Sequence, residues 1–149
     1  MQPILDVITI LCIGLMIGAE FTVSAFINPI LQQLGASAQA HATQLFARKL
    51  GAIMPFWYAL SLLLLIAETI IAWHAPGMAL LVSASAIWVA VIVFTLMFLV
   101  PINNRIANAE SGAFTPALRR QHTQWDILHR GRVLALSVAM ICMLVGIRM

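Results

Sequence analysis

Charged residues are scarce in this sequence. Only 9% of its 149 residues are charged, whereas 62% are hydrophobic, and the mean hydropathy is +1.01. A soluble domain of ordinary composition carries about a quarter charged residues. A small water-soluble fold could not cover so much apolar surface. The composition therefore excludes an ordinary soluble protein and predicts an integral membrane protein.

Cysteine and the common catalytic motifs are also rare or missing. Cys12 and Cys142 each lie inside an apolar run, where a thiol usually behaves as a small buried hydrophobe. This position argues against a disulfide or a reactive thiol. The sequence has no nucleophile elbow, phosphate-binding loop, CxxC pair or HExxH helix. It thus gives no support for hydrolytic, nucleotide-driven or zinc chemistry, and we predict no metal site.

Long apolar runs, in contrast, are abundant. A bilayer helix needs about 20 apolar residues to cross a hydrocarbon core of about 30 Å. Four runs meet this length, at residues 4–27, 51–73, 79–100 and 126–147. The turn at residues 74–77 is short and joins antiparallel neighbours. We predict an all-α, up-down-up-down four-helix bundle, a single domain over residues 1–149, with short helical segments in the two long connections.

The basic residues predict how the bundle lies in the membrane. The net charge of +3 does not indicate a nucleic-acid partner, because the basic residues lie beside the apolar runs, where they set topology. Seven lie in or next to the two long connections, and Arg148 lies on the opposite side. The seven are Arg48, Lys49, Arg105, Arg119, Arg120, Arg130 and Arg132. We predict a bacterial-type inner or plasma membrane, cytoplasmic long connections and both termini outside.

Two polar stripes reach similar depths at the predicted cytoplasmic side. The first run should stop at Asn28, because the residue before a proline is pushed out of helical geometry. Glu20 then lies about 12 Å deep, and Arg132, counted from Trp125, about 10 Å deep. At this depth the two side chains can pair. An ionisable residue inside a span suggests function, although a purely structural ion pair or a protonated Glu20 would also explain it.

Histidine and aromatic residues accompany these stripes. His129 shares a helix face with Trp125 and Arg132 and is the best candidate for proton transfer or ligation. An ordinary hydrogen-bonded interfacial histidine is the alternative. Trp57, Tyr58 and Trp125 lie near the same interface, where aromatic belts are usual. Planar residues beside a polar site would also suit a flat aromatic ligand.

Two motifs resemble a known family. Thr95 and the run Pro101-Ile102-Asn103-Asn104 form a T-x(5)-P-x-N-N pattern at the end of the third run. Trp125, His129 and Arg132 form a W-x(3)-H-x(2)-R pattern at the start of the fourth. Together with the four spans, these motifs resemble the anthrone oxygenase-like family of small four-span membrane proteins. The motifs cover about residues 95–132, and the resemblance in topology covers nearly the whole chain.

The resemblance implies O2-dependent oxidation of a flat, hydrophobic phenolic molecule in a pocket at the cytoplasmic side of the bundle. His129 would act as the base, while Arg132, Asn103 and Asn104 would hold the developing negative charge. The expected substrate-binding residues are Trp125, Asn28, Glu20, Trp57 and Tyr58. The sequence requires no cofactor, and haem b with His129 as axial ligand is the leading candidate.

Two other functions stay open. The chain is alternatively a non-enzymatic scaffold, or an accessory subunit that binds haem, quinone or a partner helix. A small proton-driven exporter also carries a membrane glutamate, but such a protein places it near the start of its first span, whereas Glu20 lies toward the end. A homo-oligomer is compatible with all three functions.

Overall fold

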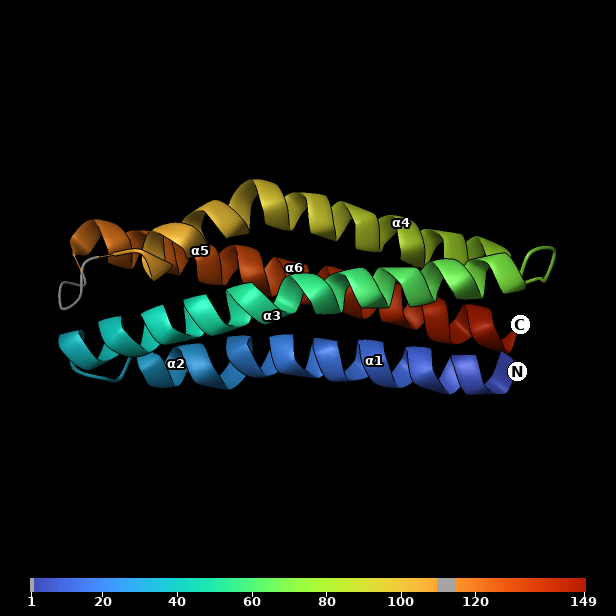
Figure 1. Cartoon of the computed structure of the whole chain (residues 1–149), viewed down its shortest axis with the longest axis horizontal. Coiled ribbons are helices and arrows are strands. Elements are labelled where there is room, and N and C mark those ends of the chain that lie inside the picture. Colours follow the sequence, from blue (N-terminus) through green and yellow to red (C-terminus); the bar gives the residue numbers. More distant parts are fainter. Residues whose placement is uncertain (1, 110–114) are drawn as a thin grey trace.

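The chain forms four long helical rods that run antiparallel, with both termini at the same end (Figure 1). The computed structural model describes residues 2–109 and 115–149. The first rod consists of α1 (Gln2–Thr22), η1 (Val23–Ile27) and α2 (Asn28–Leu31), and the second rod is α3 (Ala36–Ile71). The third rod consists of α4 (Met78–Phe94), η2 (Thr95–Leu99) and α5 (Val100–Ala107), and the fourth rod is α6 (Pro116–Arg148). The predicted all-α, four-helix bundle is confirmed.

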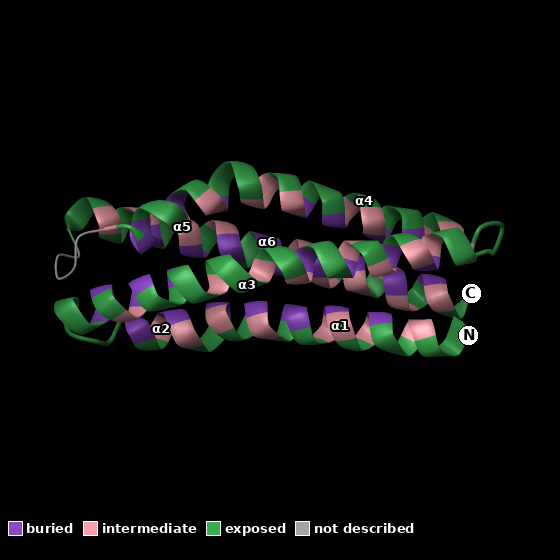
Figure 2. Ribbon diagram, viewed as in Figure 1, coloured by how far each residue is buried: buried purple, intermediate pink, exposed green. Residues whose placement is uncertain are grey.

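Each rod is long and apolar enough to cross a membrane. In the most apolar stretch of each rod, only 17% to 28% of the residues are buried inside the bundle. The exposed surfaces of the rods therefore carry many large apolar side chains, and exposed positions run along the outside of every rod (Figure 2). Lipid tails suit such a surface and water does not. The protein is an integral membrane protein.

The four rods close into a ring around a narrow core. The first rod packs against α3 and α6, and α4 packs against the same two helices. Large side chains from all four fill the core, among them Ile13, Leu65, Trp88 and Leu136. At the end near the termini, Gly77 and Gly146 let the start of α4 approach the end of α6 so closely that a Cβ on Gly77 would overlap the Gly146 carbonyl group.

The helices begin and end differently from the sequence expectation. The first rod was expected to stop at Asn28–Pro29, yet it continues to Leu31. The segments expected as short separate helices in the two long connections are the first turns of α3 and α6, which continue without a break into the second and fourth apolar runs. The N-terminus of α6 is stabilised, because Pro116 occupies its first turn and the Thr115 hydroxyl accepts a hydrogen bond from the Leu118 N–H at 3.2 Å.

Two π-helical segments explain how the first and third rods pass a proline. Pro29 and Pro101 each follow the first residue of a π-helix by six positions, from Val23 and Thr95. A proline lacks an N–H group and its ring crowds the carbonyl one turn earlier, so it usually kinks or breaks a regular helix, although α3 continues through Pro55 as an α-helix. The wider π-helical turn absorbs this conflict without ending the rod. Both π-helices lie in the half of the bundle farther from the termini (Figure 1).

Candidate functional site

A cavity of about 600 Å³ lies beside the two π-helices. Its walls come from α1 with η1, from α3, from α4 with η2 and α5, and from α6. Most of these side chains are apolar, including Met54, Leu62, Ile92 and Leu99. Small-molecule sites usually have volumes of about 300–1,000 Å³. The cavity is therefore large enough for a ligand of several fused rings.

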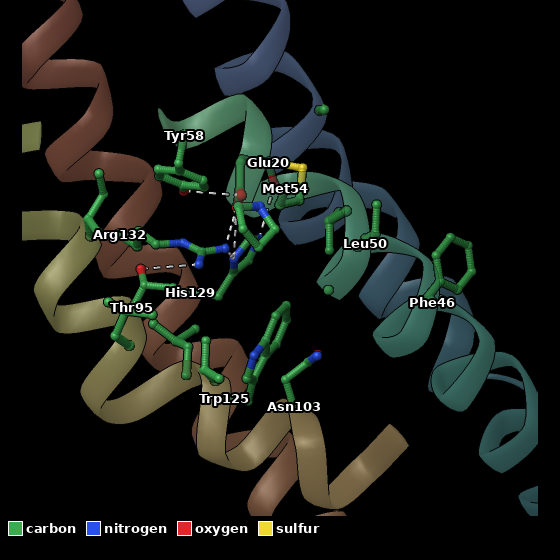
Figure 3. A pocket seen from close by; sticks show the side chains of 18 of the residues that line it. Glu20, Phe46, Leu50, Met54, Tyr58, Thr95, Asn103, Trp125, His129 and Arg132 are labelled. Atoms are coloured by element: carbon green, nitrogen blue, oxygen red, sulfur yellow. Dashed lines mark hydrogen bonds and ion pairs between the residues drawn. The ribbon is translucent and has the colours of Figure 1, made fainter. Parts of the chain in front are cut away.

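The polar groups of this cavity form one buried network (Figure 3). The Arg132 Nη2 donates to Glu20 Oε2 at 2.5 Å and lies 2.9 Å from His129 Nδ1. Glu20, His129 and Arg132 have exposed fractions of only 3%, 1% and 8%. Two opposite charges thus lie deep in the bundle, where an ion pair in good geometry offsets much of the cost of leaving water.

The contacts of His129 define its hydrogen positions. Its Nε2 lies 3.1 Å from the backbone oxygen of Glu20. Because a carbonyl oxygen only accepts, Nε2 carries the hydrogen and donates it. The other ring nitrogen, Nδ1, lies 2.9 Å from Arg132 Nη2 and 3.2 Å from Glu20 Oε2, and in the neutral ring it accepts from Arg132. Both nitrogens of the neutral ring are therefore engaged, and the basic nitrogen is the one that faces Arg132.

Tyr58 and Thr95 complete the network. The Tyr58 hydroxyl donates to Glu20 Oε1 at 3.1 Å, and Arg132 Nη1 donates to the Thr95 hydroxyl over a longer 3.4 Å. The Arg132 guanidinium also lies over the Tyr58 ring, 5.6 Å from its centre. The Arg132 Nε is buried and has no partner among the described residues. Arg132 thus keeps unused donor capacity at the cavity wall.

Three stacked rings follow one face of α6. Trp125 lies parallel to His129, with ring centres 4.6 Å apart, and His122 stacks on the other side of Trp125 at 6.3 Å. These positions are three to four residues apart, so a helix places them one above another. Trp125 lines the cavity (Figure 3) and presents a flat apolar surface next to the polar network.

The structure brings most of the predicted site residues to this cavity. Glu20, Tyr58, Asn103, Trp125, His129 and Arg132 all line it. The Asn103 side chain donates its N–H to the Ala47 backbone oxygen at 3.0 Å, which links α5 to α3. Asn103 lies in α5, two residues after Pro101 and four residues after the end of η2.

Three predicted site residues lie elsewhere. Asn104 is exposed and does not line the cavity. Trp57 is half-buried and donates to the Cys12 backbone oxygen at 3.1 Å. Asn28 is buried but donates to Asp126 at 2.7 Å and lines a separate small cavity of about 50 Å³. These three side chains are not part of the network around Arg132.

Sequence reasoning missed parts of the site. Thr95 was quoted only as part of a motif, yet its hydroxyl contacts Arg132. Asp126 was not considered, although it is buried and pairs with Asn28 and Arg130. Thr95 begins η2 six residues before Pro101, but Val23 holds the same position in η1, so this spacing does not single out a threonine.

In the ligand-free structure His129 does not present a free ring nitrogen to a haem iron. An axial histidine must turn a free nitrogen toward the iron, whereas both ring nitrogens of His129 already have partners. Within residues 2–109 and 115–149, no group of three or more His, Cys, Asp or Glu side chains could hold a metal ion. An absorption spectrum of the purified protein would test for haem directly.

The protein belongs to the class of four-helix membrane bundles that enclose an apolar cavity, here with a buried Glu–His–Arg network in the cavity wall. The sequence pattern of a known family, anthrone oxygenase, matches residues 42–142. The match covers more than half of the chain, and the chain therefore belongs to this family. The matched region contains Tyr58, Thr95, His129 and Arg132 but not Glu20. No curated protein and no solved structure matches the chain.

Proposed function

We propose that this protein oxidises a flat phenolic aromatic molecule of the anthrone type with O2, inside the cavity above Arg132. The observation that carries the proposal is the combination of an apolar cavity of about 600 Å³ with a Glu20–His129–Arg132 network in its wall. Membership of the anthrone oxygenase family supports it. The apolar walls suit the rings, and the network suits the acidic centre of such a molecule.

The chemistry needs O2 and proton transfer. A base removes a proton from the ring methylene group, and the charge that results is delocalised onto the ring oxygen. The carbanion donates its electron pair to O2, which forms a carbon–oxygen bond, and return of the proton gives a hydroperoxide. Loss of the second methylene hydrogen and cleavage of the O–O bond then release water. The sum converts CH2 and O2 into C=O and H2O.

In this proposal Arg132 binds the substrate oxygen and His129 accepts the methylene proton. The substrate oxygen carries the developing negative charge and attracts the Arg132 guanidinium, which has unused donor capacity. When Arg132 turns toward that oxygen, its contact with His129 Nδ1 is released, and Nδ1 becomes free to accept the methylene proton. The His129 ring stays oriented, because its Nε2 still donates to the Glu20 backbone oxygen. Trp125 supports the flat rings beside it.

The test is O2 consumption by the protein in vesicles with an anthrone, together with formation of the anthraquinone. We expect His129→Ala to reduce turnover by about 10²–10⁴-fold, the usual contribution of a positioned base, while the bundle stays folded. His41→Ala is the matched control, because His41 is exposed and lies outside the cavity lining. Equal turnover in wild type and His129→Ala would overturn the role of His129.

A second function has one observation in its favour. Both nitrogens of His129 are engaged in the ligand-free network, as expected for a site that binds a quinone or phenol without reacting. Such an accessory protein would bind an anthraquinone in the cavity and consume no O2 with an anthrone. Measurements of O2 consumption and anthraquinone formation therefore separate this accessory protein from the oxidase.

A further inference from the structure

We propose that the cavity exchanges its ligand sideways with the hydrocarbon region of the bilayer, through an opening between α3 and η2. The aromatic nature of the ligand rests on the proposed function, but the opening rests on the shape of the bundle. It follows that the protein takes a ligand dissolved in the membrane and not one delivered from water.

The rim of this opening is made of exposed residues that also line the cavity. On α3 these include Gly51, Pro55 and Ala59, which are spaced four residues apart and so lie on one face of the helix. Opposite them on η2 lies Leu96, with an exposed fraction of 61%. Phe46 on α3 and Thr22 on α1 are also exposed and line the cavity. A residue that is both exposed and cavity-lining marks a place where the cavity reaches the surface. The short side chains of Gly51 and Ala59 on α3 do not cover the opening.

The π-helix explains why the wall is open here. Helix α3 packs against α4 and α5. The η2 segment that joins those two helices packs against α6 and makes at most a weak contact with α3. Figure 1 shows the third rod bowing outward around η2. At the far end of the opening the wall closes again, because Asn103 donates to the Ala47 backbone oxygen. A Cβ at Gly51 would lie only 2.8 Å from Asn103 Nδ2, so the two helices touch there.

The opening lies at hydrocarbon depth. Lys49 on α3 and Arg105 on α5 are exposed charged residues that cannot lie far inside a lipid core. From Lys49 to Ala59 the helix rises about 15 Å, and from Arg105 to Leu96 about 14 Å. The hydrocarbon core is about 30 Å thick, so both rims reach well into it. A molecule that enters here comes from among the lipid tails.

The route toward the polar end of the bundle is narrow. The small cavity of about 50 Å³ lies on that side and shares Phe46, Asn103 and Trp125 with the large one. Its other walls include the polar side chains of Asn28 and Thr43. A space of this size holds a water molecule but not fused aromatic rings. It suits the passage of water, while the lateral opening suits the organic ligand.

The experiment measures the binding rate of a hydroxyanthraquinone, followed by its own fluorescence, to protein in lipid vesicles. Leu96→Trp should obstruct the rim. Met97→Trp is the matched control, because Met97 has a similar exposed fraction of 63% but does not line the cavity. We expect Leu96→Trp to slow both association and dissociation by roughly tenfold, with a smaller effect on affinity, and Met97→Trp to leave both rates unchanged.

The amount of lipid gives an independent test of the same route. At fixed total quinone, more vesicle lipid dilutes the quinone within the membrane, so the association rate should fall in proportion. Unchanged rates in Leu96→Trp, equal slowing in Met97→Trp, or a rate that follows the aqueous concentration would each overturn the proposal. Ala59→Trp on the other rim, with the exposed Ala52→Trp as control, serves as a second pair if Leu96→Trp fails to fold.

Binding and turnover are separate results in this design. If the quinone binds through the opening but no anthrone is oxidised, the proposed oxidation fails and the lateral route stands. If anthrone is oxidised while both tryptophan variants bind the quinone at the wild-type rate, the oxidation stands and the lateral route fails.

Discussion

Arg132 is the residue on which the contacts of the site converge. Its guanidinium donates to Glu20, His129 and Thr95, and all of this takes place inside a membrane bundle. Removal of one partner of a buried ion pair leaves the other charge without compensation, which is far more costly than removal of both. The pair should therefore contribute to stability in a way that a double-mutant cycle can measure.

Glu20→Ala should lower the free energy of unfolding by about 3–5 kcal/mol, since it leaves the Arg132 charge buried and unpaired. The double variant Glu20→Ala with Arg132→Met should be closer to wild type than Glu20→Ala alone. Equilibrium denaturation of the detergent-solubilised protein would measure both.

Arg130 on the same helix supplies the control. It is 58% exposed in its pair with Asp126, and Arg130→Ala should cost only about 0–1 kcal/mol, as for most surface pairs. If Arg132→Met lowered the free energy of unfolding equally in wild type and in Glu20→Ala, the two side chains would not be coupled.

The sequence predicted the Glu20–Arg132 contact only as far as depth allows. Counting residues from the ends of the spans placed both side chains at one level, and the structure has the ion pair. Depth does not define how a helix is rotated about its axis, so the counting could not show which stripes face each other. The bond from His129 to the Glu20 backbone was also beyond the sequence, because backbone acceptors are the same at every residue.

At the scale of elements, the two π-helices shape the cavity. Pro29 and Pro101 were interpreted as ends of apolar runs, yet the rods continue through both. The sequence rule expects a proline to end a regular α-helix, because proline removes a hydrogen bond. At Pro29 and Pro101 it fails because a wider turn placed before each proline absorbs the disruption, and α3 continues through Pro55 without such a turn. The sequence analysis therefore ended the first and third helical rods too early.

Pro101→Ala should straighten the third rod. Alanine restores the missing N–H group and removes the crowding by the ring, which in a helix interior costs up to about 3 kcal/mol. We expect a higher melting temperature and, since η2 would move toward α3, a cavity that binds the hydroxyanthraquinone at least roughly tenfold more weakly, equal to about 1.4 kcal/mol.

Pro116→Ala is the matched control for this change. Pro116 lies in the first turn of α6, where no N–H partner is lost, so neither stability nor binding should change much. Thermal unfolding and quinone titration in the same vesicles would test both variants. A Pro101→Ala protein with unchanged affinity would show that the proline does not maintain the cavity.

At the scale of the whole molecule, composition alone was sufficient to predict the fold class. Four apolar runs near the length of a bilayer can only be helices in a membrane, and the short turn at residues 74–77 requires that the two runs it joins be antiparallel. The helix ends were less predictable. Residues 30–50 suggested a separate segment, but most of them belong to α3, which runs as one continuous helix from Ala36 to Ile71.

The orientation of the bundle in its membrane is still a prediction. Exposed basic residues gather at the end of the bundle that holds the cavity, including Arg48, Lys49, Arg105 and Arg130, and Arg148 lies at the other end. Such a bias places the basic end in the cytoplasm. A periplasmic alkaline phosphatase fused after Met149 should therefore be active in a bacterial host, whereas green fluorescent protein fused there should be dark. Fusions in the turn at residues 74–77 should behave in the same way. The opposite pattern would place the cavity at the outer side and would require the proton and water of the proposed reaction to exchange with the periplasm.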